Sequence, residues 1–361
     1  MSLDAELAAV IEASGHGGAA IDFASWAHRI FRRQYECNAP YRAFCDRRGV
    51  TPATVASWED IPAVPTRAFR TTALACGPVE REFRTSGTTG GTDTRGRHLI
   101  PHLALYRASA LGWFVPCVLP DATRLARLAL LPPPAVRGDS SLVQMAQWVG
   151  DALCTTTEWF ADAHGFGVEQ LRDRLGVAVE RGEAVLLFGP TVAFARLFAA
   201  LRDSGRTLRL PPPSRLMDTG GSKGLVRPLS RGAFFREAYA WLGLASYFCV
   251  NEYGMTELCS QRYDSVLRDR FAGASLAPRR LVPPPWLRTR VLDPDTLRPA
   301  QAGEAGLLCH HDLANAGSVA VVLTEDIGRT VGDDGIEILG RVEGAVPRGC
   351  GSLLADLREP G

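Results

Sequence analysis

Two short segments of this chain carry residue types suited to chemistry on phosphates. Residues 84–92 read Arg-Thr-Ser-Gly-Thr-Thr-Gly-Gly-Thr, a glycine loop rich in hydroxyl groups. Residues 250–257 read Val-Asn-Glu-Tyr-Gly-Met-Thr-Glu and bring an aromatic ring, a hydroxyl and a carboxylate close together. Glycines allow a backbone to approach an anion closely, so that its N–H groups can bind it. Together the segments predict a site for ATP and a divalent metal.

The glycine loop taken alone has a second interpretation. Clusters of Ser, Thr and Gly are common in surface turns. The loop is not a Walker P-loop, because no Gly-Lys-Ser/Thr sequence follows it. Arg95 and Arg97 lie just downstream. They either supply positive charge to a bound phosphate or are solvated surface arginines.

Composition excludes several other classes of protein. The chain has 361 residues and a formal charge of +1, so no bulk attraction to nucleic acid or acidic membranes is expected. Its length allows one large or two modest domains. The N-terminal residues do not resemble a secretory signal, and no apolar run approaches the roughly 18 residues of a membrane span. We therefore expect a cytoplasmic enzyme with no nucleic-acid partner and no membrane span.

Nine cysteines are scattered along the chain, and none has the CxxC spacing of zinc or redox sites. In a cytoplasmic setting they are predicted to be free thiols, most of them acting as small buried hydrophobes.

The pattern of apolar runs predicts an α/β fold with a parallel or mixed sheet. Strands are expected at residues 124–131, 184–190, 215–221 and 245–250, a helix at 191–201, and further strands at 287–292, 306–310, 319–323 and 335–339. The motifs follow strands, where ligands bind in open α/β sheets. The predicted domains are a helical N-terminal segment (1–75), an α/β core (76–285), a β-rich subdomain (286–340) and a short tail (341–361).

In type and order, four motifs resemble those of the adenylate-forming enzymes. They are residues 86–90 (the phosphate loop), 253–257, 324–328 (Thr-Glu-Asp-Ile-Gly) and 340–341 (Gly-Arg). Within that superfamily the sequence is most similar to the LuxE-type acyl-protein synthetases of bacterial bioluminescence, and it also resembles phenylacetate-CoA ligases. Segments 58–65, 219–224, 311–315 and 348–350 add to the resemblance, which runs from about residue 55 to the C-terminus.

The resemblance implies the large N-terminal domain of an adenylate-forming enzyme. The small mobile C-terminal domain of these enzymes is expected to be absent or reduced to a tail, because only 20 residues follow Arg341. The implied reaction joins a carboxylic acid and ATP into acyl-AMP and pyrophosphate, then transfers the acyl group to a thiol on a partner protein, a carrier protein or coenzyme A. The alternatives are an acyl- or aryl-CoA ligase and a catalytically silent, nucleotide-binding scaffold subunit.

The resemblance also implies a role for each residue of the phosphate site. The β- and γ-phosphates are expected to lie against the loop residues Thr85, Ser86, Gly87, Thr88, Thr89 and Gly90. Thr256 is expected to contact the α-phosphate. Glu257 is expected to hold Mg²⁺, a hard ion that prefers carboxylate and phosphate oxygens. The alternative for Glu257 is a carboxylate at the start of a helix, favoured by the helix dipole.

The nucleoside has its own implied contacts. Tyr253 is expected to stack on adenine, although a core aromatic with a bonded hydroxyl is the alternative. Asp326 is expected to accept the ribose hydroxyls, although it is equally typical of a turn before a glycine. Arg341 is expected to contact ribose or phosphate. Gly220 and Gly221 are expected to line the adenine or acyl pocket.

Three further residues complete the candidate set. In the bioluminescence synthetases a cysteine near the C-terminus accepts the acyl group, and Cys350 matches it. Arg348 would favour its thiolate, whereas the alternative is an unreactive cysteine in a glycine turn. Lys223 is a weaker candidate near the substrate carboxylate, and His311 is expected to be structural.

Overall fold

The computed structural model describes residues 2–15, 20–86, 95–220, 229–275 and 277–342, together with Gly351, Leu353, Leu354, Asp356 and Leu357. Its internal contacts divide the chain into two compact units. Unit 1 comprises Met1–Trp113, Met255–Gln261 and Val282–Gly361, and unit 2 comprises Phe114–Gly254 and Arg262–Leu281. Two of the four boundaries fall within α4 (Leu103–Val118) and β10 (Leu281–Val282). The four-part division expected from the sequence stays a prediction.

Unit 2 is built on a mainly parallel sheet. Its strands, in spatial order, are β9 (Arg262–Asp264), β8 (Cys249–Tyr253), β7 (Arg215–Thr219), β6 (Val185–Pro190), β4 (Ala126–Ala129) and β5 (Thr157–Trp159). All neighbours are parallel except β9, which is antiparallel to β8. The helices are α5 (Pro134–Arg137), α6 (Ser141–Leu153), α7 (Val168–Arg181), α8 (Thr191–Ser204), α9 (Arg231–Leu242) and α10 (Val266–Phe271), with the 3-10 helix η4 (Ser246–Phe248).

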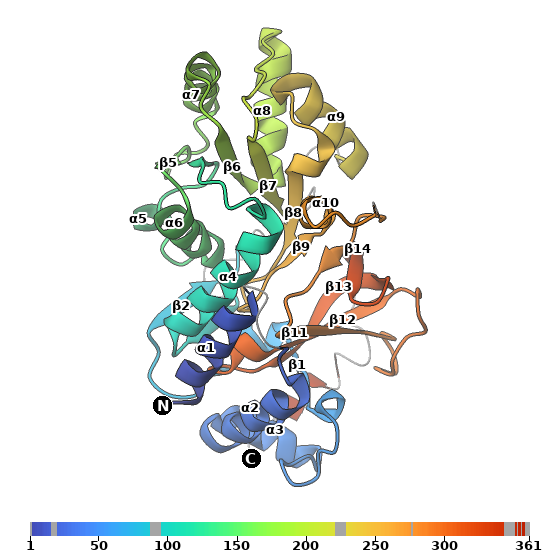
Figure 1. Cartoon of the computed structure of the whole chain (residues 1–361). Coiled ribbons are helices and arrows are strands. Elements are labelled where there is room, and N and C mark those ends of the chain that lie inside the picture. Colours follow the sequence, from blue (N-terminus) through green and yellow to red (C-terminus); the bar gives the residue numbers. More distant parts are fainter. Residues whose placement is uncertain are drawn as a thin grey trace. The chain divides into compact units, whose positions relative to one another are not determined.

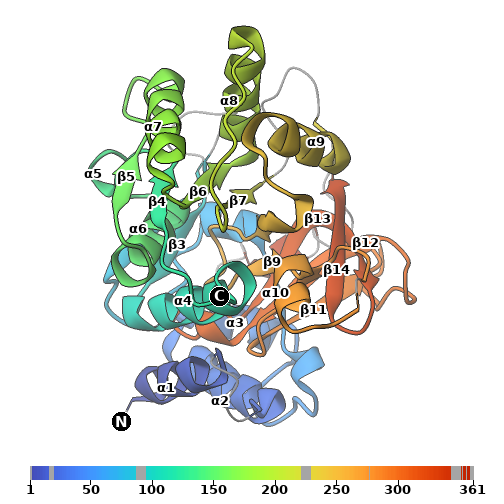
Figure 2. The ribbon, with the colours of Figure 1, turned by 45° about the horizontal axis from the view of Figure 1, so that its top comes forward.

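Local sequence explains how these helices end. Gly182, Gly205 and Gly243 follow α7, α8 and α9 and take left-handed backbone angles, with φ of 64°, 63° and 69°. Glycine adopts this conformation without a steric cost, so it closes a helix readily. The three helices lie side by side (Figures 1 and 2) and bury apolar residues such as Phe194 and Phe234 in one core with the strands.

Unit 1 is built on antiparallel strands. In spatial order these are β11 (Leu287–Leu292), β12 (Gly306–Asp312), β13 (Val321–Val331) and β14 (Gly335–Arg341), and the short β1 (Val64–Pro65) joins β13 in parallel. A separate antiparallel pair consists of β2 (Arg81–Arg84) and β3 (Arg97–Ile100). The remaining elements are the helices α1 (Leu3–Gly15), α2 (Phe23–Cys37) and α3 (Ala39–Arg47) and the 3-10 helices η1 (Trp58–Asp60), η2 (Thr66–Arg70) and η5 (Leu313–Asn315).

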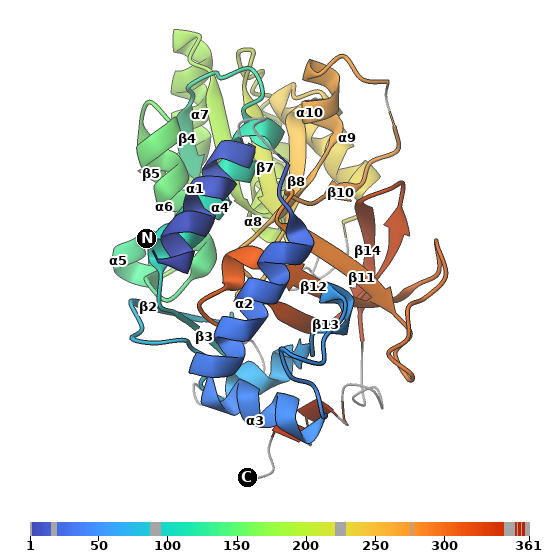
Figure 3. The same ribbon diagram turned by 60° about the horizontal axis from the view of Figure 1, so that its bottom comes forward.

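Helix α2 packs against the connection between β12 and β13 (Figure 3). Asp22 caps its start by accepting a hydrogen bond from the backbone N–H of Ser25 at 3.1 Å. Farther along, the fully buried Gln34 donates to the carbonyls of Asn315 and Ala316 and accepts from the N–H of Ala320 at 3.1 Å. These bonds satisfy buried backbone groups that no strand pairs, and they fix the connection that carries η5.

The predicted α/β fold with a mixed sheet is confirmed, and most predicted strands are present. One prediction is partly wrong: within residues 245–250, Ser246–Phe248 form η4, and the strand begins only at Cys249. Residues 246–248 continue into the strand with no break in the apolar pattern, so the pattern does not distinguish the 3-10 helix from the strand. No helix in the described part of the chain is long and apolar enough to cross a bilayer.

The prediction of free thiols is wrong at two positions. Cys37 and Cys76 form a disulfide between the end of α2 and the segment before β2. They are 39 residues apart, so no short sequence motif predicts the disulfide. Buried thiols outside any disulfide are Cys45, Cys117, Cys154, Cys249, Cys259 and Cys309, as expected.

Candidate active site

The two ends of the glycine loop are fastened together in unit 1. Thr85 follows β2 and Gly96 precedes β3. The Thr85 N–H donates to the Gly96 carbonyl at 3.0 Å, and the Gly96 N–H donates to the Thr85 hydroxyl at 2.9 Å. Arg95 donates to the carbonyls of Thr85 and Arg84, so this arginine braces the base of the loop. Arg97 instead pairs with Glu82 at the surface, as the surface interpretation predicts.

Thr256 and Glu257 occupy the middle of a turn that the N–H of Leu258 closes onto the carbonyl of Met255 at 3.1 Å. The interpretation of Glu257 as a helix-start carboxylate is therefore wrong. Two side chains from distant parts of unit 1 hold this turn. Nδ1 of His98, on β3, lies 2.6 Å from the Thr256 carbonyl, and the amide of Asn315 donates to the Glu257 carbonyl at 2.9 Å.

Burial keeps His98 neutral. Its side chain is 1% exposed, and burial lowers its pKa to about 4 despite the hydrogen-bonding partners Thr256 and Asn315. A neutral ring has one N–H to donate, and the shorter contact is the one to Thr256. The sequence analysis missed His98 because it lies 158 residues from Thr256 and carries no motif.

The Glu257 carboxylate lies beside the base of the loop. A Cβ atom built on Gly96 would lie 3.5 Å from Oε1 of Glu257 and 3.0 Å from Cγ2 of Thr85, so glycine leaves room for both side chains. Burial raises the pKa of the Glu257 carboxyl to about 7. The positive charges of Arg341 and Arg70 act in the opposite direction, whereas Asp326 raises the pKa further.

Asp326 and Arg341 face each other across β13 and β14. They are directly paired in the antiparallel register, and Nε of Arg341 lies 3.8 Å from Oδ1 of Asp326. Residues in such a pair point to the same face, which explains how two motifs fifteen residues apart act at one place. Asp326 therefore lies within a strand, and its interpretation as a turn residue is wrong.

Glu325 binds two arginines beside this pair. Arg341 reaches its carboxylate at 3.2 Å, and Arg67 of η2 forms a second ion pair with it. In the adenylate-forming enzymes a glycine usually occupies this position, so the resemblance gave Glu325 no role. The structure gives it one: it orients Arg341 and anchors η2 on β13.

The segment 311–315 acquires a role that its sequence did not reveal. Asp312 caps η5 and accepts hydrogen bonds from the N–H of Cys259 at 2.8 Å and the hydroxyl of Ser260 at 2.5 Å. Asn315 holds Glu257, as described above. Hydrogen bonds from Asp312 and Asn315 therefore hold the backbone of residues 257–260 in place.

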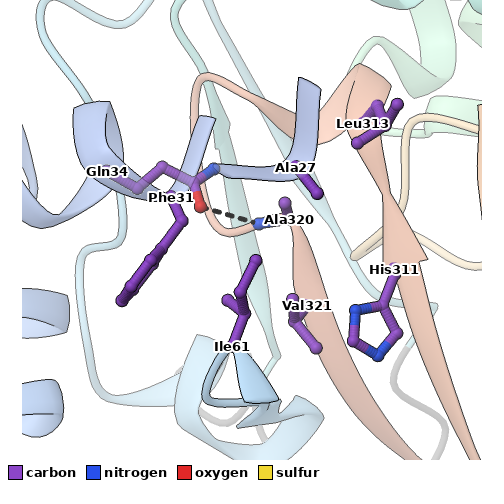
Figure 4. Close-up of a pocket in the computed structure, with 8 residues that line it drawn as sticks. All are labelled: Ala27, Phe31, Gln34, Ile61, His311, Leu313, Ala320 and Val321. Carbon is purple, nitrogen blue, oxygen red and sulfur yellow. Dashed lines mark hydrogen bonds between the residues drawn. The ribbon is translucent and has the colours of Figure 1, made fainter. Parts of the chain in front are cut away.

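His311 lies away from these residues. It lines a cavity of about 10 Å³ between α2 and β12, with Phe31, Ile61 and Leu313 among the lining residues (Figure 4). Its ring meets the edge of Trp58 at 4.7 Å between centroids, and burial lowers its pKa to about 3. These surroundings support the structural role expected for His311.

The chemistry of Glu257 fits a divalent cation. Its carboxylate has no ion-pair partner in the described part of the chain. Its Oε1 and the Thr85 hydroxyl would each lie 3.5 Å from a Cβ atom built on Gly96. Among the described residues no three His, Cys, Asp or Glu side chains are grouped to bind a metal without other ligands. A Mg²⁺ ion commonly binds through one or two carboxylates and substrate phosphates, for which one carboxylate beside a phosphate loop is sufficient.

Unit 2 contains the remaining described candidates. Gly220 follows β7 with φ of 76°, and Tyr253 is the half-buried last residue of β8. Between these strands, Thr219 donates to the buried carboxyl of Glu252. One residue earlier in each strand, the side-chain amide of Asn251 donates to Asp218, which also forms an ion pair with Arg231.

Several predicted residues lie outside the described part of the chain. They are Gly87, Thr88, Thr89, Gly90, Gly221, Lys223 and Cys350. Of the predicted catalytic and nucleotide-binding residues, unit 1 brings together Thr85, Glu257, Asp326 and Arg341, with Thr256 on the same turn.

The mixed α/β fold is the one that the resemblance to the adenylate-forming enzymes implies. Comparison with known proteins gives the family. Residues 23–357 match the model of the family described as acyl-protein synthetase, LuxE, and the chain belongs to this family.

Individual relatives agree with this assignment. A long-chain-fatty-acid–luciferin-component ligase of Vibrio harveyi is 24% identical over 341 residues, covering 89% of this chain and 84% of the relative. The ligase of the same name from Aliivibrio fischeri is 33% identical over 82 residues, covering 20% of this chain and 22% of the relative.

Solved structures share the fold. A 2-hydroxyisobutyryl-CoA ligase in complex with its acyl-adenylate has a TM-score of 0.66 at 15% identity, over 88% of this chain and 66% of the ligase. An ATP-bound MatB of Rhodopseudomonas palustris has a TM-score of 0.51 at 16% identity, over 80% of this chain and 52% of MatB. The chain thus spans about two thirds of the first of these structures and about half of the second.

Proposed function

We propose that this chain uses ATP to activate a carboxylic acid as acyl-AMP, releasing pyrophosphate, and then passes the acyl group to a thiol. The observation that carries the proposal is the grouping in unit 1 of Glu257, the loop base at Thr85 and the Asp326–Arg341 pair. Membership of the acyl-protein synthetase family supports the same reaction.

The chemical step is an in-line displacement at the α-phosphorus, in which positioning and charge stabilisation do most of the work. The loop from Thr85 and Ser86 to Gly90 binds the β- and γ-phosphates, and Thr256 contacts the α-phosphate. Glu257 would hold the Mg²⁺ that accompanies ATP, and this ion would supply positive charge to the phosphate oxygens.

The nucleoside is bound at two further places. The carboxylate of Asp326 accepts hydrogen bonds from the two ribose hydroxyls. Arg341 contacts the ribose or the α-phosphate. Gly220, Gly221 and Tyr253 contribute to the adenine or acyl pocket. Cys350 is the proposed first acceptor of the acyl group, and a partner protein, a carrier protein or coenzyme A is the final one.

The name of the curated relatives makes a long-chain fatty acid the first substrate to test. Two alternative functions are compared with this proposal. The CoA-ligase structures favour an acyl- or aryl-CoA ligase, which differs in its thiol acceptor. A silent nucleotide-binding scaffold is disfavoured by the intact Thr256, Glu257, Asp326 and Arg341.

The experiment is ATP–pyrophosphate exchange with Mg²⁺ across fatty, aryl and amino acids, on the wild type and on Glu257→Ala. Exchange with one class of acid, lost in the variant, is the expected result. Absence of exchange with every acid, despite measurable ATP binding, would overturn the proposal in favour of a scaffold. Acyl labelling of the protein, blocked by Cys350→Ser, then separates the acyl-protein synthetase from a CoA ligase.

A further inference from the structure

The 3-10 helix η2 carries arginines at two positions three residues apart, Arg67 and Arg70. A 3-10 helix has three residues per turn, so side chains at positions i and i+3 lie above each other on one face. Arg67 on this face forms the ion pair with Glu325 of β13. Arg70 therefore extends from the same face, one turn farther along.

Both sides of η2 are anchored to the candidate site. Arg67 binds Glu325, the neighbour of Asp326. The buried ring of Phe69 meets the edge of His98 at 5.7 Å between centroids, and His98 contacts the Thr256 carbonyl. Because Arg67 and Phe69, which precede Arg70 in the same short helix, are held by β13 and β3, the end of η2 that carries Arg70 is fixed near the turn of Thr256 and Glu257.

Arg70 differs from the other arginines of this region in having no assigned partner. Arg67 and Arg341 both bind Glu325, and Arg95 binds backbone carbonyls at the loop base. In the described part of the chain, Arg70 has no hydrogen-bond or ion-pair partner, and its side chain is exposed. Its charge nevertheless acts on the Glu257 carboxylate, since it lowers the pKa of that group.

The balance of charge shows what this arginine is available to do. Arg67 and Arg341 are matched by Glu325 and Asp326, and Glu257 is the proposed Mg²⁺ ligand. A polyphosphate arriving at Glu257 brings more negative charge than a divalent ion cancels. An exposed guanidinium beside that site offers several N–H donors that suit phosphate oxygens.

We propose that Arg70 is a further catalytic residue, which binds the phosphate chain of ATP and stabilises pyrophosphate as it leaves. This inference rests on the proposed function. In the step, a carboxylate oxygen of the acid forms a bond to the α-phosphorus, and the bond from that phosphorus to the oxygen bridging to the β-phosphate breaks. The leaving pyrophosphate keeps the electron pair of the broken bond, and no proton is transferred. Arg70 therefore acts only by stabilising negative charge on the pyrophosphate.

The test is exchange kinetics on Arg70→Gln and Arg70→Lys, with Arg32→Gln on α2 as a matched control that removes another exposed arginine. We expect Arg70→Gln to lower kcat/KM about 100-fold, as loss of a charged transition-state contact does, and to raise KM for pyrophosphate about tenfold. Lysine keeps the charge without the planar fork, so Arg70→Lys should recover part of the loss. The control and the thermal midpoints should stay at wild-type values.

The outcomes separate this inference from the proposed function. Exchange by Arg70→Gln within about threefold of wild type, or an equal loss in Arg32→Gln, would overturn the role of Arg70 while the proposed function stands. If the wild type shows no exchange, the proposed function fails, and calorimetry of MgATP binding decides about Arg70. About tenfold weaker binding by Arg70→Gln supports the phosphate contact, and equal binding overturns it.

Discussion

Two buried glutamates, one in each unit, have the same acidity and different neighbours. Glu257 of unit 1 is 7% exposed and Glu252 of unit 2 is 4% exposed, and burial raises the pKa of each carboxyl to about 7. Glu257 is flanked by the charges of Arg341 and Arg70. Glu252 has the Thr219 hydroxyl and the like charge of Asp218.

Burial alone therefore does not define a catalytic carboxylate. Two arginines and the base of the glycine loop lie near Glu257, so its carboxyl can ionise to bind a metal–nucleotide complex. The neighbours of Glu252 offer no such compensation, and a neutral carboxyl sharing a hydrogen bond with a hydroxyl is the stable arrangement there. In the proposed function, Glu257 of unit 1 thus takes part in the reaction, whereas Glu252 joins two strands of the sheet in unit 2.

The largest expected effect is on catalysis. Glu257→Gln should lower ATP–pyrophosphate exchange at least about 100-fold, because the amide cannot supply the anionic ligand that Mg²⁺ needs. Glu252→Gln, a matched change in an equally buried carboxyl, should stay within about tenfold of wild type. Similar losses in the two variants would break the contrast between the glutamates.

Asp326→Asn tests whether the cross-strand pair contacts the nucleoside. Loss of the charged acceptor should raise KM for ATP about 10- to 100-fold, the range of a hydrogen bond to a charged group. KM for pyrophosphate should remain unchanged, because pyrophosphate has no ribose. If both constants rise together, the carboxylate acts on the phosphate site as a whole and not on ribose.

His98→Leu should cost stability because it leaves the buried Thr256 carbonyl without its donor. We expect a loss of about 2 kcal/mol in urea unfolding. His98→Gln, which can still donate, should lose less. Equal stability of the leucine variant and the wild type would mean that the ring does not hold the turn.

The pH dependence of stability gives His98 a distinct signature. Its folded pKa of about 4 lies below the unfolded value near 6.5. Between these values the unfolded chain binds the extra proton, so this contribution to stability is present above pH 6.5 and is lost as pH falls toward 4. Urea midpoints measured across this window should show the loss in wild type but not in His98→Gln.

Glu252 should give the smallest effect, with the opposite sign. Its folded pKa of about 7 lies above the ordinary value of 4.5, so the folded state holds the extra proton between these values. This contribution is present below pH 4.5 and declines as pH rises through 7. Glu252→Gln should therefore gain about 1 kcal/mol relative to wild type at pH 8 and little at pH 5, by urea unfolding. A gain that does not depend on pH would contradict the assignment.

Sequence alone named the candidate site residues but not the residues that hold them in place. The motifs named Thr85, Thr256, Glu257, Asp326 and Arg341, because the residue types and order of these segments resemble a known family. The supporting contacts join residues that are far apart in the chain and belong to no local pattern. His98 reaches Thr256 across 158 residues, and Arg67 reaches Glu325 across 258.

The limits of pattern reading also appear in the secondary structure. The strand at 185–190 is an uninterrupted apolar run followed directly by a helix, so its position was predictable. At 245–250 an aromatic run precedes β8 instead of forming it. The predicted roles of Gly220 and Tyr253 in unit 2 stay predictions.

The most direct test of the account follows one oxygen atom. The acid that supports exchange is labelled with ¹⁸O in both carboxylate oxygens. It is then incubated with the protein, ATP, Mg²⁺ and hydroxylamine as the acyl acceptor, and the masses of the products are measured by mass spectrometry. Attack of the carboxylate on the α-phosphorus predicts AMP carrying one ¹⁸O and a hydroxamate carrying the other. Label in inorganic phosphate, with ADP as the nucleotide product, would show an acyl-phosphate reaction and contradict adenylate formation.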